Sequence, residues 1–213
     1  MSYVAIISAC SSEPENRWIV ESETENYSLQ YVGDTIEIVA PKGLTLWNEK
    51  TFCAPITFEY EAKVVYENEG DRLSDLNCFW MASDPRCGGD ALRDTATRRG
   101  NFNKTYALQL YYVGYGGNSN KTTRFRRYNA DVRGIVDKQF RPQILTEYTD
   151  SAHLLVANHW YKIRIESRAD GRNLYFVNNE KLVDYVDSVP LKEGLFGLRT
   201  THSHVKFRNF RAY

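Results

Sequence analysis

The stretch from Thr105 to Tyr128 reads TYALQLYYVGYGGNSNKTTRFRRY and predicts a β-hairpin. Two runs rich in aromatic and β-branched residues, 106–113 and 122–128, flank a turn of glycines and asparagines, a composition typical of paired strands. Successive side chains of a strand point to opposite faces. We therefore expect one face of the hairpin to carry an amide, a phenol and guanidinium groups side by side, from Gln109, Tyr111, Arg124, Arg126 and Tyr128.

That set of side chains suits a sugar that carries carboxylates, because planar guanidinium groups bind carboxylates through paired hydrogen bonds. The charge distribution agrees with this interpretation. From Arg93 to Arg141 the chain has eleven Lys or Arg against three acids, a net charge of +8, and the remainder carries −8. The alternative interpretation of the hairpin is a solvated surface with ordinary arginines. The alternative interpretation of the charge distribution is that these charges pair with one another within the fold.

Length and composition indicate one sizeable domain. The chain has 213 residues, 42% of them hydrophobic and 14% aromatic, which is enough for a core of ordinary size. A formal net charge of zero argues against nucleic acid as the partner of the whole protein. No stretch approaches the roughly 20 apolar residues of a membrane-spanning helix, so no membrane span is predicted.

The cysteines do not predict a metal site. Cys10, Cys53, Cys78 and Cys87 lack the close spacing of metal ligands, and no CxxC motif occurs. Cys78 stands in an apolar run and is expected to be buried, and a disulfide among the last three cysteines stays open. No metal and no cofactor are predicted; a structural calcium held by loop carbonyls is left open.

The first 26 residues are predicted to be a polar segment that precedes a single domain over residues 27–213. The sequence Ile7-Ser8-Ala9-Cys10 looks like a lipoprotein cleavage box, although the preceding residues are few and carry no cation. Either a longer signal lies upstream and the protein is in the bacterial cell envelope or periplasm, with a lipid anchor, or the protein is cytoplasmic. We favour the first alternative.

Elsewhere the chain alternates in the manner of strands. Residues Ile56 to Val65 alternate apolar and polar positions, whereas Asn77 to Ala82 is almost wholly apolar and predicts a central strand buried on both faces. A short edge strand is expected near Trp18, and the long segment Ser83 to Lys104 has no clear period. Turn signals every 8 to 12 residues and the near absence of helical periodicity predict an all-β fold, an antiparallel sandwich of two sheets.

The last third of the chain carries a family resemblance. The blocks Trp160–Ile165, Leu174–Asn178, Gly194–Thr200 and Val205–Phe210 resemble the closing half of a concanavalin A-like (laminin-G-like) jelly roll. The middle blocks, Phe79–Pro85, Tyr111–Asn118 and Thr122–Tyr128, are similar to a bacterial family akin to the YesU-like proteins found with pectin and rhamnogalacturonan utilisation systems. The resemblance implies a concave sheet that faces a glycan, a surface on which lyases, glycosidases and lectins all occur.

Cleavage of a uronate by β-elimination needs a group that neutralises the carboxylate, a base and an acid. Gln109-Leu110-Tyr111 is similar to the Gln-x-His element of alginate-lyase-like jelly rolls, with Tyr in place of His. Tyr111, His202 and His204 are therefore the candidate catalytic residues. The candidate contacts to the acidic polysaccharide are Gln109, Tyr115, Asn118, Arg124, Arg126, Tyr128 and Arg99.

Two alternatives remain beside the lyase. A glycoside hydrolase needs a pair of carboxyls, and Glu59 and Glu61 share one strand face, although a solvated outer face is the interpretation that we favour for them. A non-catalytic carbohydrate-binding module needs only aromatic and planar polar side chains, which the hairpin offers. The sequence thus predicts a bacterial glycan-degradation protein that acts on an acidic polysaccharide or oligosaccharide, by β-elimination in preference to the two alternatives.

Overall fold

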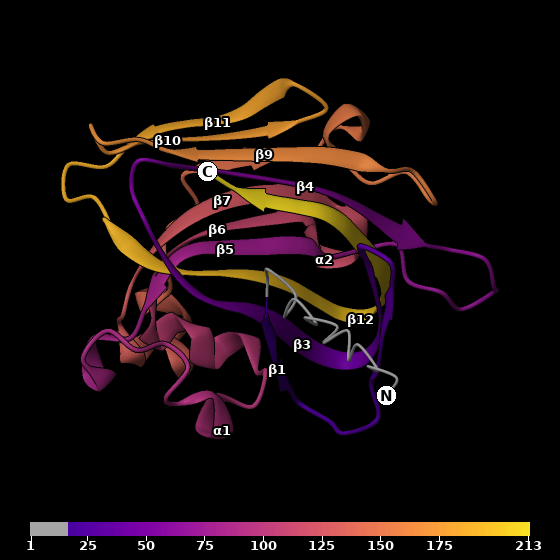
Figure 1. The fold of residues 1–213 in the computed structure, drawn as a ribbon, viewed down its shortest axis with the longest axis horizontal. Helices are drawn as coiled ribbons and strands as arrows, with labels where there is room; N and C mark the ends of the chain where they lie inside the picture. The colour runs from indigo at the N-terminus through magenta and orange to yellow at the C-terminus, as the bar shows by residue number, and fades with distance from the viewer. Residues whose placement is uncertain (1–16) are drawn as a thin grey trace, which may run out of the picture.

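A computed structural model of the chain describes residues 17–213, so the predicted lipoprotein box lies outside the described residues. Twelve strands make up almost all of the regular structure (Figure 1). They are β1 (Trp18–Ser22), β2 (Ser28–Val32), β3 (Thr35–Cys53), β4 (Ile56–Val65), β5 (Leu76–Ser83), β6 (Gln109–Gly116), β7 (Thr122–Asn129), β8 (Thr146–Tyr148), β9 (Tyr161–Ser167), β10 (Arg172–Val177), β11 (Glu180–Val186) and β12 (Glu193–Ala212). The helical elements are single turns, among them α1 (Thr95–Arg98), η2 (Phe102–Ala107) and α2 (Gly117–Asn120).

The strands form two antiparallel layers that share their two longest members. Strand β12 pairs with β5 through Leu195–Arg199 and with β4 through His204–Ala212, and β3 follows it along nearly its whole length. The first layer therefore runs β8-β7-β6-β5-β12-β3-β1, and the second runs β11-β10-β9-β4-β12-β3-β2. This is the predicted all-β sandwich of two antiparallel sheets, a jelly roll of the concanavalin A-like type.

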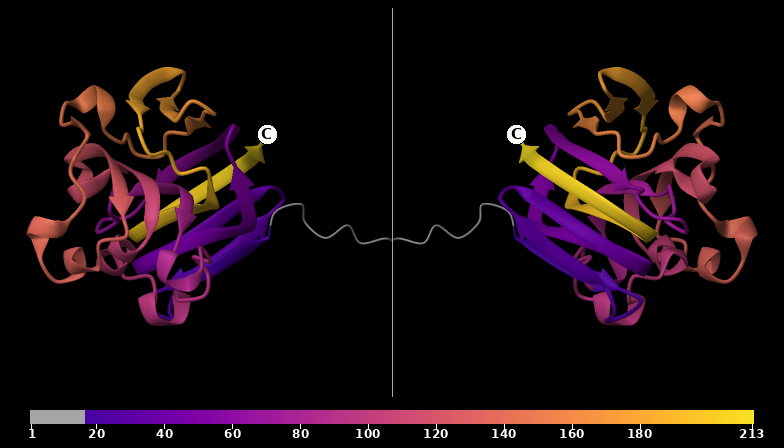
Figure 2. Two further views of the ribbon diagram at one scale, coloured as in Figure 1. Left: turned by 90° about the vertical axis from the view of Figure 1, so that its left-hand side faces the viewer. Right: turned by 90° about the vertical axis from the view of Figure 1, so that its right-hand side faces the viewer.

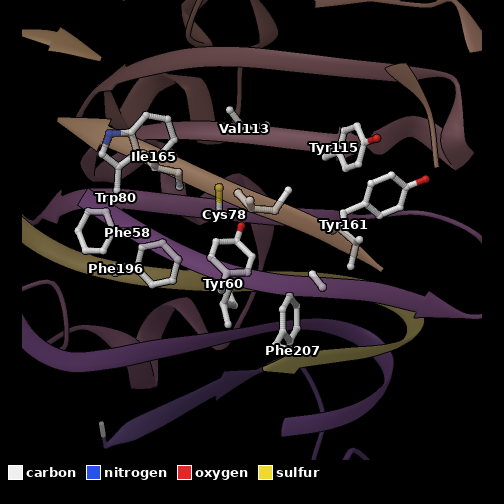
Figure 3. Packing of buried hydrophobic residues seen from close by; sticks show 14 of the residues in the cluster. Phe58, Tyr60, Cys78, Trp80, Val113, Tyr115, Tyr161, Ile165, Phe196 and Phe207 are labelled. Carbon is white, nitrogen blue, oxygen red and sulfur yellow. The ribbon is translucent and has the colours of Figure 1, made fainter. Parts of the chain in front are cut away.

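Aromatic and aliphatic side chains fill the space between the layers. Phe58 and Tyr60 of β4 face Cys78 and Trp80 of β5, and Phe196 of β12 joins them (Figure 3). The alternation predicted for residues 56–65 is present, because the positions between these core residues point out of the second layer. The thiol of Cys78 is buried as expected, and burial raises its pKa to about 12.

A second, smaller apolar cluster lies on the outer face of the first layer, the face that points away from the second layer. Trp47, Phe79 and Leu110 belong to this cluster. Residues 84–107, which we call the covering segment, lie over it on the side of the molecule away from β9–β11 (Figures 1 and 2). Strand β5 is therefore buried on both faces, as its apolar composition predicted.

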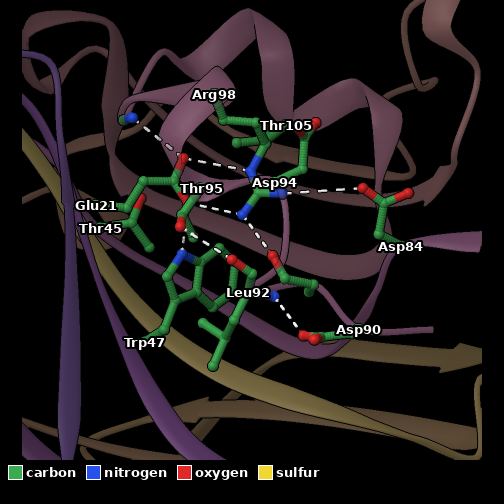
Figure 4. A network of polar contacts seen from close by, with 12 residues as sticks. Glu21, Thr45, Trp47, Asp84, Asp90, Leu92, Asp94, Thr95, Arg98 and Thr105 are labelled. Atoms are coloured by element: carbon green, nitrogen blue, oxygen red, sulfur yellow. Dashed lines mark hydrogen bonds and ion pairs between the residues drawn. The ribbon is translucent and has the colours of Figure 1, made fainter. Parts of the chain in front are cut away.

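A buried carboxylate fastens the covering segment to β1. The Glu21 carboxylate accepts hydrogen bonds from Arg98 Nη2 at 2.7 Å, Trp47 Nε1 at 2.9 Å and the Gly100 backbone N–H at 3.1 Å (Figure 4). Both partners of the Glu21–Arg98 ion pair are 1% exposed. Strand β1 is the edge strand expected near Trp18, and it pairs with β3 although it precedes residue 27, where the domain was predicted to begin.

Candidate functional site

A cavity of about 290 Å³ lies on the outer face of the first layer, between the covering segment and α2. Cross-strand pairing places its floor in one row across four strands, from Arg199 through Asn77 and Gly114 to Arg124. The lining residues are Glu23, Arg72, Asp75, Asn77, Phe102, Tyr112, Gly114, Gly117, Asn118, Thr122, Arg124, Arg126, Arg199 and Thr201. They come from four strands, α2, the covering segment and two loops, so only the assembled sandwich brings them together.

Four arginines line the cavity, and a protein acceptor holds each of them. Arg72 pairs with Asp75 and Arg124 with Glu147, each at 2.5 Å. Arg126 Nη1 donates to the Pro142 carbonyl at 2.6 Å. A guanidinium has five N–H donors, so each side chain is fixed in place and keeps donors for a ligand. Fixed donors lose little conformational entropy when a ligand binds.

Two of the four arginines have no carboxylate partner in the described part of the chain. Arg199 donates to the Thr45 hydroxyl at 2.9 Å and to the Gly100 carbonyl at 2.8 Å. Both acceptors are neutral groups, as is the Pro142 carbonyl that accepts from Arg126. No ion pair within residues 17–213 includes either side chain. Arg199 is 2% exposed, and burial lowers the pKa of its guanidinium. Glu21, Glu23 and Asp75 lie near enough to oppose this fall in pKa, but none of these three forms an ion pair with Arg199. A buried cation without a directly bonded carboxylate favours an anionic ligand.

The phenol of Tyr112 forms part of the cavity wall and lies across Gly114. A Cβ at position 114 would come within 2.8 Å of Tyr112 Cζ, so the phenol occupies this place only because residue 114 has no side chain. Burial raises the pKa of Tyr112 well above its ordinary value. The phenol is therefore protonated at neutral pH and is a hydrogen-bond donor.

We expect Gly114→Ala to displace the Tyr112 phenol and to lower the free energy of unfolding by about 1–3 kcal/mol, the usual cost of an extra methyl group in a packed site. Denaturant unfolding measures this cost. Gly117→Ala is the matched control, because a Cβ there would meet its nearest atom at an ordinary 3.7 Å. Equal stabilities of the two variants would show that the close approach of Tyr112 does not constrain residue 114.

The register of the hairpin corrects the predicted face. Tyr112 pairs with Arg126, and Gly114 with Arg124, whereas Tyr111 pairs with Arg127 on the inner face. The Tyr111 phenol expected beside the arginines therefore points into the sandwich. Arg124, Arg126 and Asn118 do line the cavity, and their role as ligand contacts stays a prediction.

Tyr111, predicted as catalytic, lies in the core between the layers. Its hydroxyl donates to Asp187 Oδ2 at 2.7 Å and accepts from the Leu191 N–H at 3.1 Å, and burial raises its pKa. Tyr115 is also in this core, packed edge-on against Tyr161 at 5.1 Å. Neither phenol is open to a ligand, so their predicted contact with the sugar is corrected.

The other predicted residues are spread over the molecule. Tyr128 is on the outer face but is fully buried beneath the covering segment, against Tyr106 and Tyr112. Gln109 lines a separate cavity of about 550 Å³ beside the loop Gly88–Ala91, and Arg99 lines another of about 410 Å³ beside Glu21. The structure therefore does not bring these side chains to the arginine-lined cavity.

Neither of the two histidines is among the residues that line this cavity. His204 Nε2 is 2.6 Å from Glu37 Oε1, on the outside of the second layer, where Lys206 also contacts Glu37. His202 is exposed at an irregularity of β12 with φ 49°, and its Nδ1 is 3.2 Å from the Thr201 hydroxyl. Neither imidazole lines the cavity, so the prediction that they act on a ligand beside Arg124 and Arg126 is corrected.

Sequence reasoning missed Arg72, Asp75, Asn77, Tyr112 and Arg199. A signal was present for two of these residues, because Asn77 stands in a strand that is otherwise almost wholly apolar and Arg199 directly follows the apolar run Leu195–Leu198. Arg72 and Asp75 stand in a loop that gave no signal of its own. No cluster of three metal-ligating side chains occurs within residues 17–213.

The fold and this cavity define a concanavalin A-like β-sandwich with an arginine-lined cavity on the outer face of one sheet. The chain belongs to the family described as Domain of unknown function (DUF6250), whose sequence profile matches residues 38–210. No match was found among curated proteins. None of the helices in the described part of the chain is long and apolar enough to cross a membrane.

Three solved structures illustrate the similarity in fold. A Bacillus subtilis protein of unknown function with a galectin-like fold superposes with a TM-score of 0.69 at 14% identity, over 92% of this chain and 88% of that one. The carbohydrate-binding module CBM66 from Bacillus subtilis has a TM-score of 0.58 at 15% identity, over 92% and 94%. A prokaryotic β-1,3-1,4-glucanase from a mouse hindgut metagenome has a TM-score of 0.56 at 8% identity, over 95% and 94%. Identities this low establish the fold alone.

Proposed function

We propose that this protein binds an acidic glycan in the cavity on the outer face of its first layer. One observation carries the proposal: Arg126 and Arg199 line the cavity without a carboxylate partner among the described residues. The lining as a whole has four arginines against two acids, Glu23 and Asp75. A ligand carboxylate supplies the missing counter-ion, and the planar guanidinium matches its geometry.

The size and position of the cavity support a sugar as the ligand. Pockets for drug-sized ligands have volumes of roughly 300–1,000 Å³, and about 290 Å³ is at the low end of that range, which suits one or two sugar rings. Phe102 and Tyr112 provide aromatic surface next to the arginines. Two proteins of similar fold are a carbohydrate-binding module and a glucanase, which supports a glycan as the ligand here.

We expect calorimetric titration to detect binding of polygalacturonate, rhamnogalacturonan or alginate, and affinity to fall as salt is added, because exposed charges are screened. Neutral galactan and β-glucan are the matched controls. Equal binding of acidic and neutral polymers, or no binding of any acidic polymer, would contradict the proposal. The inclusion of rhamnogalacturonan also tests the predicted kinship with the YesU-like proteins of pectin systems.

β-Elimination is the second candidate function, and Tyr112 is the observation in its favour. Its phenol lies in the cavity, where the charges of Arg199 and Arg126 oppose the rise in its pKa caused by burial. Proton donation to a leaving oxygen would suit this phenol. A lyase releases a product with a conjugated double bond that absorbs ultraviolet light. Binding without new absorbance and without new reducing ends would establish a binding module.

The glycoside hydrolase alternative receives less support from the geometry. Glu59 and Glu61 line a separate small cavity of about 170 Å³ on the outside of the second layer, and Glu61 pairs with Arg208 at 2.7 Å. Asp75, within the main cavity, is already paired with Arg72. The predicted setting, a bacterial glycan-degradation system at the cell envelope, remains part of the proposal. The role in glycan degradation is tested by identifying the glycans that the protein binds.

A further inference from the structure

We propose that the cavity recognises a single uronic acid residue through two adjacent groups: its carboxylate at Arg199 and Arg126, and one ring hydroxyl that donates to Asn77 Oδ1. This inference rests on the proposed function and names the part of the glycan that the protein recognises. It assigns to Asn77 the role of a specificity-determining residue.

The orientation of the Asn77 amide is fixed by its neighbour. Its Nδ2 donates to Asp75 Oδ1 at 3.2 Å, and a carboxylate can only accept, so the carbonyl Oδ1 must point the other way. Asp75 is itself held by Arg72 at 2.5 Å and by the Ser74 hydroxyl at 3.0 Å. The acceptor is therefore in position before a ligand arrives.

Asn77 Oδ1 has no protein donor. The side chain is 3% exposed and lines the cavity, and Oδ1 is a buried oxygen without a hydrogen-bond partner in the described structure. Buried polar groups are nearly always paired, and an exception calls for an explanation. A ligand hydroxyl in the cavity would supply the hydrogen-bond donor that Asn77 Oδ1 lacks.

The neighbours of Asn77 place a cation and a phenol beside its amide. Asn77 pairs with Arg199 on one side and Gly114 on the other. Adjacent strands are about 4.8 Å apart, comparable to the separation of a carboxylate and a hydroxyl on one sugar ring. The Tyr112 phenol lies over Gly114, so a ligand beside Asn77 would meet the phenol on that side. A single uronate ring can thus contact the cation and the acceptor together.

The test is calorimetric titration of the whole protein with D-galacturonate, D-glucuronate and inorganic sulfate. We expect Asn77→Ala to weaken binding of the preferred uronate by about three- to tenfold, the effect of one neutral hydrogen bond, and to leave sulfate binding unchanged because sulfate at neutral pH carries no donor. Asn129→Ala, at the exposed far end of β7, is the matched control and should change neither affinity.

A ligand-side measurement keeps the test independent of how the variant folds. Among singly deoxygenated forms of the preferred uronate, one should bind the wild-type protein three- to tenfold more weakly than the parent sugar and lose nothing further in Asn77→Ala. If the protein binds uronates but neither Asn77→Ala nor any deoxygenation weakens binding, the inference is overturned and the proposed function stands. If no uronate or uronate polymer binds, both are overturned.

Discussion

Replacement of Glu21 by alanine is expected to lower the free energy of unfolding by about 3–5 kcal/mol, the usual effect of removing one partner of a buried ion pair. Arg98 would then be a buried cation without its carboxylate, at 1% exposure. Trp47 Nε1 and the Gly100 N–H would lose their acceptor as well. The covering segment is therefore expected to detach from β1.

Urea unfolding gives the stability change, and amide hydrogen exchange over residues 84–107 reports detachment of the covering segment. Glu49→Ala is the matched control, because Glu49 pairs with Arg17 at 3.4 Å on the surface and such pairs contribute about 0–1 kcal/mol. A loss of less than about 1 kcal/mol in Glu21→Ala would show that the buried pair does not hold the segment. Phe102 belongs to this segment and lines the cavity, so weaker glycan binding should accompany the detachment.

Replacement of Arg126 by alanine is expected to weaken the binding of acidic glycans by about ten- to a hundredfold. Hydrogen bonds to a charged group contribute about 1.5–3 kcal/mol, and each 1.4 kcal/mol is a factor of ten in affinity. Affinity for neutral glycans should not change, because they bring no anion to the site. Stability should change little, since Arg126 is only partly buried and its Nη1 donates to a neutral group, the Pro142 carbonyl.

Calorimetric titration with the acidic polymer that the wild-type protein prefers measures this effect. Arg133→Ala is the control, because Arg133 is exposed and pairs with Asp131 outside the cavity. Arg126→Lys keeps the charge but loses the fork of donors, so its affinity should fall between those of the wild type and the alanine variant. Unchanged affinity in Arg126→Ala would remove this residue from the proposed anion site.

Predictions that depended on one strand at a time were confirmed. The apolar positions of residues 56–65 face the core, and residues 77–82 are buried on both faces. The turn signals expected between strands are present as well: Asn178 and Asn179, for example, join β10 to β11, and both have positive φ as such a turn requires. These features follow from the pleat of a single strand or from local turn chemistry, which neighbouring residues alone decide.

Predictions that depended on how two strands meet were less successful. Tyr111 was predicted to lie beside the arginines, but the tyrosine that lines the cavity is Tyr112. A shift of one residue along a strand exchanges its two faces. The sequence of each strand shows which residues alternate, but only the pairing register shows which set joins Arg124 and Arg126. The same holds for Asn77 and Arg199, which are neighbours although 122 positions separate their numbers.

By itself the sequence determined an all-β sandwich, its strand alternation and a basic central segment, because short-range periodicity and composition encode these properties. The tertiary structure alone decided that Arg72, Asn77, Tyr112 and Arg199 line the cavity with Arg126, while Tyr111 and His204 do not. The physical reason is that β12 crosses both layers and the covering segment closes over one of them. Contacts between residues so far apart in the chain depend on register and layer packing, which no local pattern specifies.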